Sequence, residues 1–232
     1  MILPDAVRAR AILLDRVVTL TIHGPTIFLA DFEDGSGGYN SDGFTYTPDP
    51  DSTSNLWHGT ARRSVSPSHS QYYGLESTGN YNTGARTAGN LLSPNISLVG
   101  VTSPIILSYK YFMQTENSPS WDIATVQIST NSGITWITLG TLTDSASFTT
   151  VSSDISAYAG KKIQIRFNFD TIDGVANTYE GWYIDDVMIT GTPAMPGIAV
   201  TVPTTATEGD GVLTGQGVVY LPSLPTNNVI EE

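Results

Sequence analysis

Four carboxylates are the residues of this sequence best suited to chemistry: Asp31 and Glu33 near the start, and Asp185 and Asp186 much later. If residues 181–187 form a strand, the two adjacent aspartates point to opposite faces. One of them then faces inward or toward a sheet edge, where an unpaired carboxylate is costly. A bound cation would offset that cost, and calcium takes six to eight oxygen ligands. The alternative is that both pairs are turn formers or solvated edge charges.

A second acidic loop, residues 170–177, follows a predicted strand. Asp170 and Asp173 place oxygen ligands there at a spacing that could hold a second ion. A turn built from Asp and Asn side chains explains the same residues equally well.

Aromatic residues supply a candidate ligand surface. Trp57 and Trp121 could form sugar-stacking platforms, because aromatic faces make apolar contact with pyranose rings. Tyr72 and Tyr73 lie in polar, loop-like sequence and are candidates for an exposed binding face. Packing inside a core is the commoner explanation for such tryptophans, and it is also the preferred interpretation of Trp136.

Motifs of known enzyme classes are missing from the sequence. There is no nucleophile elbow, no His-Glu-x-x-His, no P-loop and no dinucleotide fingerprint. The three histidines are scattered, so a catalytic triad is not indicated. We therefore expect a protein that is not an enzyme.

The elements that must position these residues are short strands separated by Gly, Asn, Asp and Pro clusters. Residues 162–170 alternate strictly between polar and apolar, and residues 104–114 repeat the pattern. A hairpin is predicted within 124–139, around the turn 130–133. These patterns predict an all-β protein, an antiparallel β-sandwich of the jelly-roll, concanavalin-like type with extra terminal strands.

The composition limits which binding partners and which cellular location we expect. The net charge of −12 disfavours nucleic acid and anionic membranes, and it favours divalent cations. The absence of cysteine excludes disulfides and thiolate metal sites. No stretch is long enough to cross a bilayer, and the Thr, Ser, Asn and Gly content favours a secreted or cell-surface protein.

Several separated motifs, in order, resemble MAM-like jelly-roll domains of bacterial secreted proteins, including the accessory domains of immune-inhibitor-A-type metallopeptidases. The motifs are residues 31–35, 55–58, 120–126 and 180–187, and the likeness covers roughly 27–191. It implies a non-catalytic accessory or adhesive domain. Vertebrate MAM domains carry disulfides, which this chain lacks, so their adhesive pairing is not carried over.

The two ends of that region also resemble the first and last strands of calcium-stabilised carbohydrate-binding modules. By position, this resemblance implicates Glu33 and Asp186 as calcium ligands, with Asp31 and Asp185 as neighbours.

The flanks resemble parts of other modules. Residues 198–232 are similar to the opening strands of Calx-β-like or Ig-like repeats, and residues 1–26 to the closing strand of such a repeat. A Pro- and Gly-rich linker is expected at 192–197, which leaves 27–191 as the main domain. Two or three strands cannot close their own core. The C-terminal strands are therefore expected to pack on the main domain, to continue into a neighbouring module, or to complete the sheet of another copy.

The sequence thus predicts a calcium-stabilised structural or adhesive module outside the cell, a subunit of a surface fibre or array assembled through its terminal strands. The alternative is a carbohydrate- or protein-binding accessory domain of a secreted hydrolase or protease.

Overall fold

The computed structural model describes residues 26–49 and 54–194, and all structural statements refer to these residues. They form twelve strands and one short 3₁₀ turn, η1 (Ser156–Tyr158). The strands are β1 (Thr26–Ala30), β2 (Thr45–Pro48), β3 (Trp57–Thr60), β4 (Ser70–Tyr73), β5 (Ala88–Leu92), β6 (Ile96–Ser97), β7 (Val101–Gln114), β8 (Ile123–Ser129), β9 (Ile137–Thr141), β10 (Thr149–Asp154), β11 (Lys162–Asp170) and β12 (Gly181–Pro193). In this part of the chain no helix is long and apolar enough to cross a membrane.

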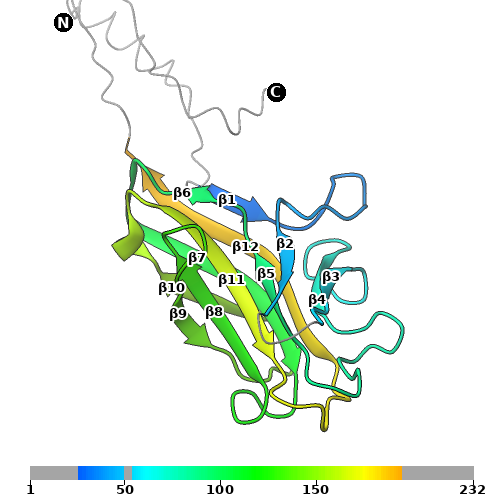
Figure 1. Cartoon of the computed structure of the whole chain (residues 1–232). Coiled ribbons are helices and arrows are strands. Elements are labelled where there is room, and N and C mark those ends of the chain that lie inside the picture. Colours follow the sequence, from blue (N-terminus) through cyan, green and yellow to red (C-terminus); the bar gives the residue numbers. More distant parts are fainter. Residues whose placement is uncertain (1–25, 50–53, 195–232) are drawn as a thin grey trace, which may run out of the picture. The chain divides into compact units, whose positions relative to one another are not determined.

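The strands form two antiparallel sheets of six strands each. The first has the order β10-β7-β12-β4-β3, with β1 also pairing with β12. The second has the order β2-β5-β11-β8-β9, with β6 also pairing with β11. Figure 1 shows β12 and β11 running through the middle of their sheets.

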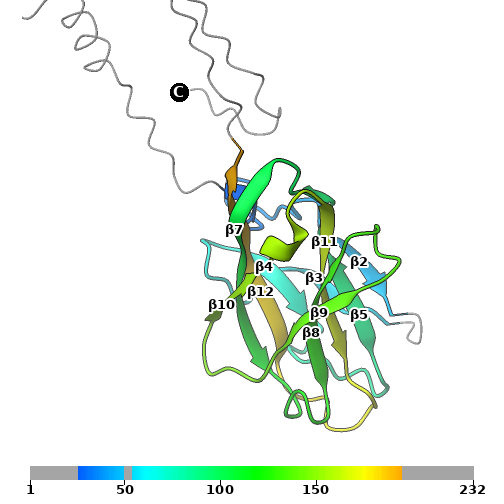
Figure 2. The same ribbon diagram turned by 90° about the vertical axis from the view of Figure 1, so that its left-hand side faces the viewer.

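The two sheets pack face to face as a sandwich (Figure 2). The chain crosses repeatedly from one sheet to the other, so that sequence neighbours such as β10, β11 and β12 alternate between them. This architecture confirms the predicted all-β jelly-roll sandwich. The first and last strands of the described domain are paired, since Ala30 of β1 lies opposite Val187 of β12.

The core follows from the alternation of the longest strands. In β11 the four apolar side chains are buried, and the polar ones between them face away: Ile163, Ile165, Phe167 and Phe169. In β7 the predicted inward set is buried in the same way: Ile105, Leu107, Tyr109, Tyr111 and Met113. Both strand predictions are confirmed.

The hairpin between β8 and β9 is confirmed as well, and its turn is made by Ser132 (φ 57°) and Gly133 (φ 81°). Trp136 follows this turn but does not join the core as predicted, because it lies on the outer side of the sheet with part of its ring exposed.

A row of rings covers the outer face of the first sheet. His58, Tyr72, Tyr183 and Phe112 are directly paired across β3, β4, β12 and β7. Tyr72 and Tyr183 are stacked, with ring centroids 4.3 Å apart and planes 13° from parallel. Tyr72, Phe112 and Tyr183 are buried, so this face of the sheet carries a second, smaller apolar cluster.

The end of the domain differs slightly from the prediction. Thr192 and Pro193 still pair with Thr102 and Val101, so the sheet extends into the first two residues of the expected linker 192–197. A proline is tolerated at the end of a strand, because its missing N–H is not needed there. The predicted terminal segments 1–26 and 198–232 lie outside the described residues, apart from Thr26 in β1, so the predictions about them stay untested.

Candidate ligand-binding site

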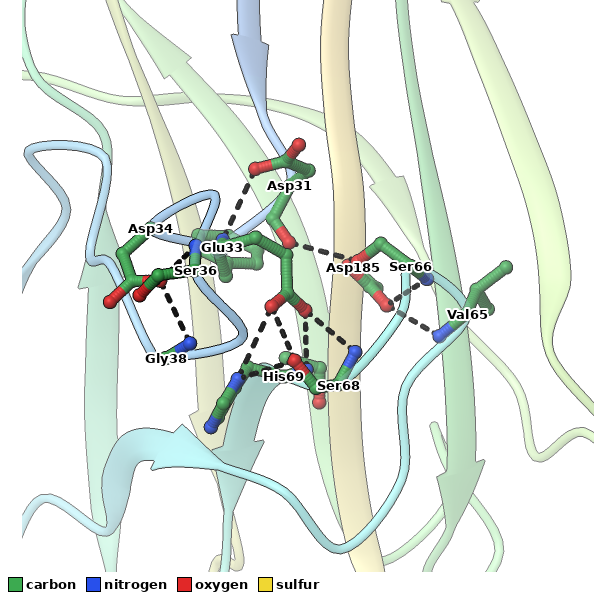
Figure 3. A network of polar contacts seen from close by, with 12 residues as sticks. Asp31, Glu33, Asp34, Ser36, Gly38, Val65, Ser66, Ser68, His69 and Asp185 are labelled. Carbon is green, nitrogen blue, oxygen red and sulfur yellow. Dashed lines mark hydrogen bonds and ion pairs between the residues drawn. The ribbon is translucent and has the colours of Figure 1, made fainter.

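Glu33, a predicted calcium ligand, sits in the loop after β1 and binds the loop before β4 (Figure 3). Its Oε1 accepts hydrogen bonds from the backbone N–H groups of Ser68 (2.9 Å) and His69 (2.5 Å), and its Oε2 accepts one from Ser68 Oγ (2.5 Å). Burial alone would raise its pKa, but these donors outweigh burial and lower the pKa to about 2. Glu33 is therefore a charged anchor for residues 68–69.

Asp185 anchors the preceding part of the same loop from β12. Its Oδ2 accepts from the N–H groups of Val65 (2.6 Å) and Ser66 (3.2 Å), and its Oδ1 accepts from Ser66 Oγ (2.9 Å). Burial raises the pKa of this fully buried carboxyl to about 6, although the hydrogen bonds act in the opposite direction. Asp31 joins the same network, because its carbonyl oxygen accepts from Ser66 Oγ (2.9 Å).

The structure thus brings Asp31, Glu33 and Asp185 to one loop, residues 65–69 (Figure 3). Asp186 is instead paired with Lys110 Nζ at 2.8 Å. Among the described residues, no group of three or more acidic or histidine side chains is arranged to hold a metal. As they are placed, the four predicted carboxylates do not surround one calcium ion, because Asp186 is paired with Lys110 while Glu33 and Asp185 accept hydrogen bonds from the loop 65–69. Calcium binding itself stays a prediction.

The second predicted ion loop is tied down by protein donors. Asp170 makes a two-point ion pair with Arg86, with N–O distances of 2.8 and 2.6 Å, and also accepts from the N–H of Ile172. Asp173 Oδ1 accepts from the N–H of Val175 at 2.7 Å. These contacts favour the turn interpretation of both carboxylates.

Three of the four predicted ligand-surface aromatics are buried, so that prediction was wrong for them. Trp57 (3% exposed) packs on Tyr73 and Trp182 in the core, where Tyr73 is fully buried. Tyr72 is fully buried in the outer aromatic row. Trp121 is 60% exposed, in the loop between β7 and β8.

A site that the sequence reasoning missed lies on the outer face of the second sheet. It is a hollow of about 320 Å³, formed by β2, β5, β11 and the β8–β9 turn. The described residues that line it are Thr47, Pro48, Asn90, Leu92, Ser132, Gly133, Trp136, Gln164 and Arg166. The sequence did contain an indication of this site. The polar residues of the strand 162–170 alternate with the buried ones, so they must share the face opposite the core.

Planar polar side chains lie in register across this face. Asn168 lies opposite Asn90 of β5 and donates from Nδ2 to Asn90 Oδ1 at 2.9 Å. Arg166 lies opposite Gln127 of β8, and Arg166 Nε donates to Gln127 Oε1 at 2.6 Å. Asn90 Nδ2 also donates to the Thr47 and Pro48 carbonyl oxygens, and Asn168 Nδ2 also donates to Asp49 Oδ2. The donors that remain for a ligand are therefore the two Nη groups of Arg166.

Trp136 borders this hollow in a fixed position. The Cζ atom of Arg166 lies 4.3 Å from the centroid of the Trp136 ring, a cation–π contact. On the turn, a Cβ at Gly133 would lie only 3.3 Å from Trp136 Cζ2. The ring is therefore positioned by its neighbours, which limits the entropy lost when a ligand binds.

A larger hollow, about 610 Å³, lies beside the loop 61–68 and Phe148, over the first sheet. Its two arginines already have carboxylate partners. Arg63 forms a two-point ion pair with Glu180, and Arg62 Nη1 lies 3.8 Å from Glu76 Oε2. Because these charges are satisfied within the protein, the hollow on the second sheet is the better candidate.

Comparison with known proteins gives one sequence relative. Bacillopeptidase F of Bacillus subtilis (strain 168) is 30% identical over 163 residues, which cover 68% of this chain and 10% of that protein. The chain therefore spans only a small part of its relative. No protein-family model matches the chain.

Among solved structures, the CBM22-1 xylan-binding domain from Paenibacillus barcinonensis Xyn10C is 11% identical, with a TM-score of 0.45, and the match covers 74% of this chain and 97% of that one. The K3 cleaved adhesin domain of Lys-gingipain from Porphyromonas gingivalis is 18% identical, with a TM-score of 0.47. That match covers 71% of this chain and 98% of the adhesin domain. The fold class of the present chain rests on its own strand pairing.

Proposed function

We propose that this chain contains a non-catalytic, extracellular accessory module that binds carbohydrate on the outer face of the second sheet. The observation that carries the proposal is the hollow on that face, where Trp136 and Arg166 border a row of amide side chains. Small-molecule sites typically combine an aromatic surface with a few oriented polar groups. Sugars match this combination, since their rings have apolar faces and their hydroxyls both donate and accept hydrogen bonds.

An extracellular, peptidase-associated role is supported by the sequence likeness to part of Bacillopeptidase F. In this proposal the module holds a larger protein on a polysaccharide surface, and any catalysis belongs to other segments of that protein.

The test is affinity electrophoresis of the full chain through gels that contain soluble polysaccharides, including xylan, galactan, mannan and pectin. The native chain is expected to be retarded by at least one of them. Trp136→Ala should reduce the apparent affinity at least tenfold, a loss of about 1.4 kcal/mol. Trp121→Ala is the matched control, because it removes an exposed tryptophan from a different loop.

Absence of retardation on every polysaccharide would refute the proposal. An affinity that falls in Trp121→Ala and not in Trp136→Ala would move the site to the β7–β8 loop. Thermal melting of both variants shows whether each is still folded.

Fibre assembly through the terminal strands stays a prediction. Deletion of residues 198–232 should abolish assembly in electron micrographs, and a deletion variant that still assembles would refute it.

A further inference from the structure

Arg166 differs from the other cations of the described residues. Four of them, Arg62, Arg63, Arg86 and Lys110, lie within 4.0 Å of a carboxylate oxygen. Lys161 and Lys162 are exposed to solvent, which screens their charges. Arg166 is half-buried and forms no ion pair with a described carboxylate. It is also the only charged side chain among the described residues that line the hollow.

The orientation of the Arg166 guanidinium is fixed by two neighbours. Its Nε donates to Gln127 Oε1, and its plane lies over the ring of Trp136. Its two Nη groups donate to no described residue. Burial lowers the pKa of Arg166, and the negative charge of Asp49 acts in the opposite direction. The Nη groups are not among the buried atoms that lack a partner, so water solvates them in the free protein, and a ligand carboxylate that replaces this water gains a paired, charge-assisted contact.

We infer that the hollow beside Trp136 receives the carboxylate of a sugar acid, so that the preferred ligand is a glycan that contains uronic acid residues. The inference rests on the proposed carbohydrate-binding function and specifies its ligand. The paired N–H groups of a guanidinium match the two oxygens of a carboxylate. The neighbouring Gln164 donates from Nε2 to the Ser93 carbonyl oxygen, and its Oε1 is then placed to accept from a hydroxyl of the same sugar ring.

A preference for an acidic glycan would be informative because it opposes the overall charge of the chain. The chain carries a net charge of −12, so a polyanionic glycan is repelled over most of the surface. Selective binding of such a ligand therefore requires a local positive site, and Arg166 is the described residue placed to provide it.

The experiment compares an oligogalacturonide with its methyl ester, in which each carboxylate has lost its charge and gained a methyl group. Binding of the full chain is measured by isothermal titration calorimetry in EDTA, so that calcium cannot bridge carboxylates. The native chain is expected to bind the acid at least tenfold more tightly than the ester at low salt, and added salt should reduce this ratio.

Arg166→Gln should bring the ratio to within about twofold, and Arg166→Lys should retain part of it because the charge stays and the paired donors are lost. Lys162→Gln is the control, since it removes the same charge from an exposed position at the start of β11. Melting temperatures establish that the variants are folded.

The outcomes separate the two proposals. Equal affinity for acid and ester, with binding still dependent on Trp136, would refute the uronate inference and support carbohydrate binding. A preference that survives Arg166→Gln would refute the role of Arg166. Equal or tighter binding of dextran sulfate would mean that charge alone is recognised, which refutes the carboxylate assignment. Failure to bind these ligands and every neutral polysaccharide would refute the proposed function itself.

Discussion

Replacing Glu33 with Gln tests the physical account of the carboxylate network. Glutamine keeps one acceptor oxygen but turns an N–H₂ group toward donors, because both oxygens of Glu33 accept from residues 68 and 69. The amide oxygen can keep the two backbone N–H donors, but each of these bonds then has a neutral acceptor and is worth about 0.5–1.5 kcal/mol instead of about 1.5–3 kcal/mol. The bond from Ser68 Oγ to the second oxygen is lost. The Glu33 side chain retains 9% exposure, so water replaces part of the loss. We expect a destabilisation of about 2–4 kcal/mol, which for a domain of this size lowers the melting temperature by about 4–16 °C.

The effect should depend on pH in a defined direction. The pKa of Glu33 is lowered from 4.5 to about 2, so its stabilising contribution is complete above pH 4.5 and is lost as the pH falls through 2. The gap in melting temperature between the native chain and Glu33→Gln should therefore be largest above pH 5 and shrink toward pH 2. Circular dichroism melts of the full chain at several pH values measure this gap.

Asp186→Asn is the control, because it removes the same charge from the partly exposed pair with Lys110. Such a pair is worth about 0–1 kcal/mol. A Glu33→Gln variant that melts within 1 °C of the native chain at pH 7, or a gap that is constant from pH 6 to pH 3, would refute the reasoning.

Three further predictions concern stability. Gly181→Ala should destabilise the domain by several kcal/mol in urea denaturation, because Gly181 has φ 103° and a Cβ there would lie 2.2 Å from the Tyr73 carbonyl oxygen. Gly140→Ala is the control and should be nearly neutral, because a Cβ at that position meets no atom within 4 Å. Tyr183→Ala should lower the free energy of unfolding by about 3–5 kcal/mol, because it opens a cavity in the outer aromatic row. Tyr183→Phe keeps the ring and should lower it by no more than about 1.5 kcal/mol. Equal effects of the two substitutions would contradict the role of ring packing. For calcium, EDTA should lower the melting temperature and Glu33→Gln should lessen that fall, while an unchanged melting temperature would exclude a stabilising ion.

The β-sandwich fold could be predicted from the sequence, because the alternation in β7 and β11 identifies the buried face of both long strands. The polar positions of the same alternation mark the outer face on which the proposed ligand site lies. What the sequence could not supply was the register that places Arg166 opposite Gln127 and Asn168 opposite Asn90, since those contacts join strands far apart in the chain.

The error at Tyr72 has a definite physical cause. Tyr72 lies in polar sequence, and its strand β4 is buried on both faces. Its outer face is covered by the loop 61–69, which Glu33 and Asp185 hold in place. Local patterns describe one strand at a time, and they carry no information about a loop that folds over it.

The pairing of β1 with β12 also has a mechanical consequence. Thr26, at the start of β1, lies opposite Thr190, three residues before the end of β12. A pulling force applied to the chain on both sides of the domain would therefore open this antiparallel pair from one end, breaking its hydrogen bonds one after another. We expect β1 to separate from β12 at low force. The chain would then become longer under load before the sandwich core opens.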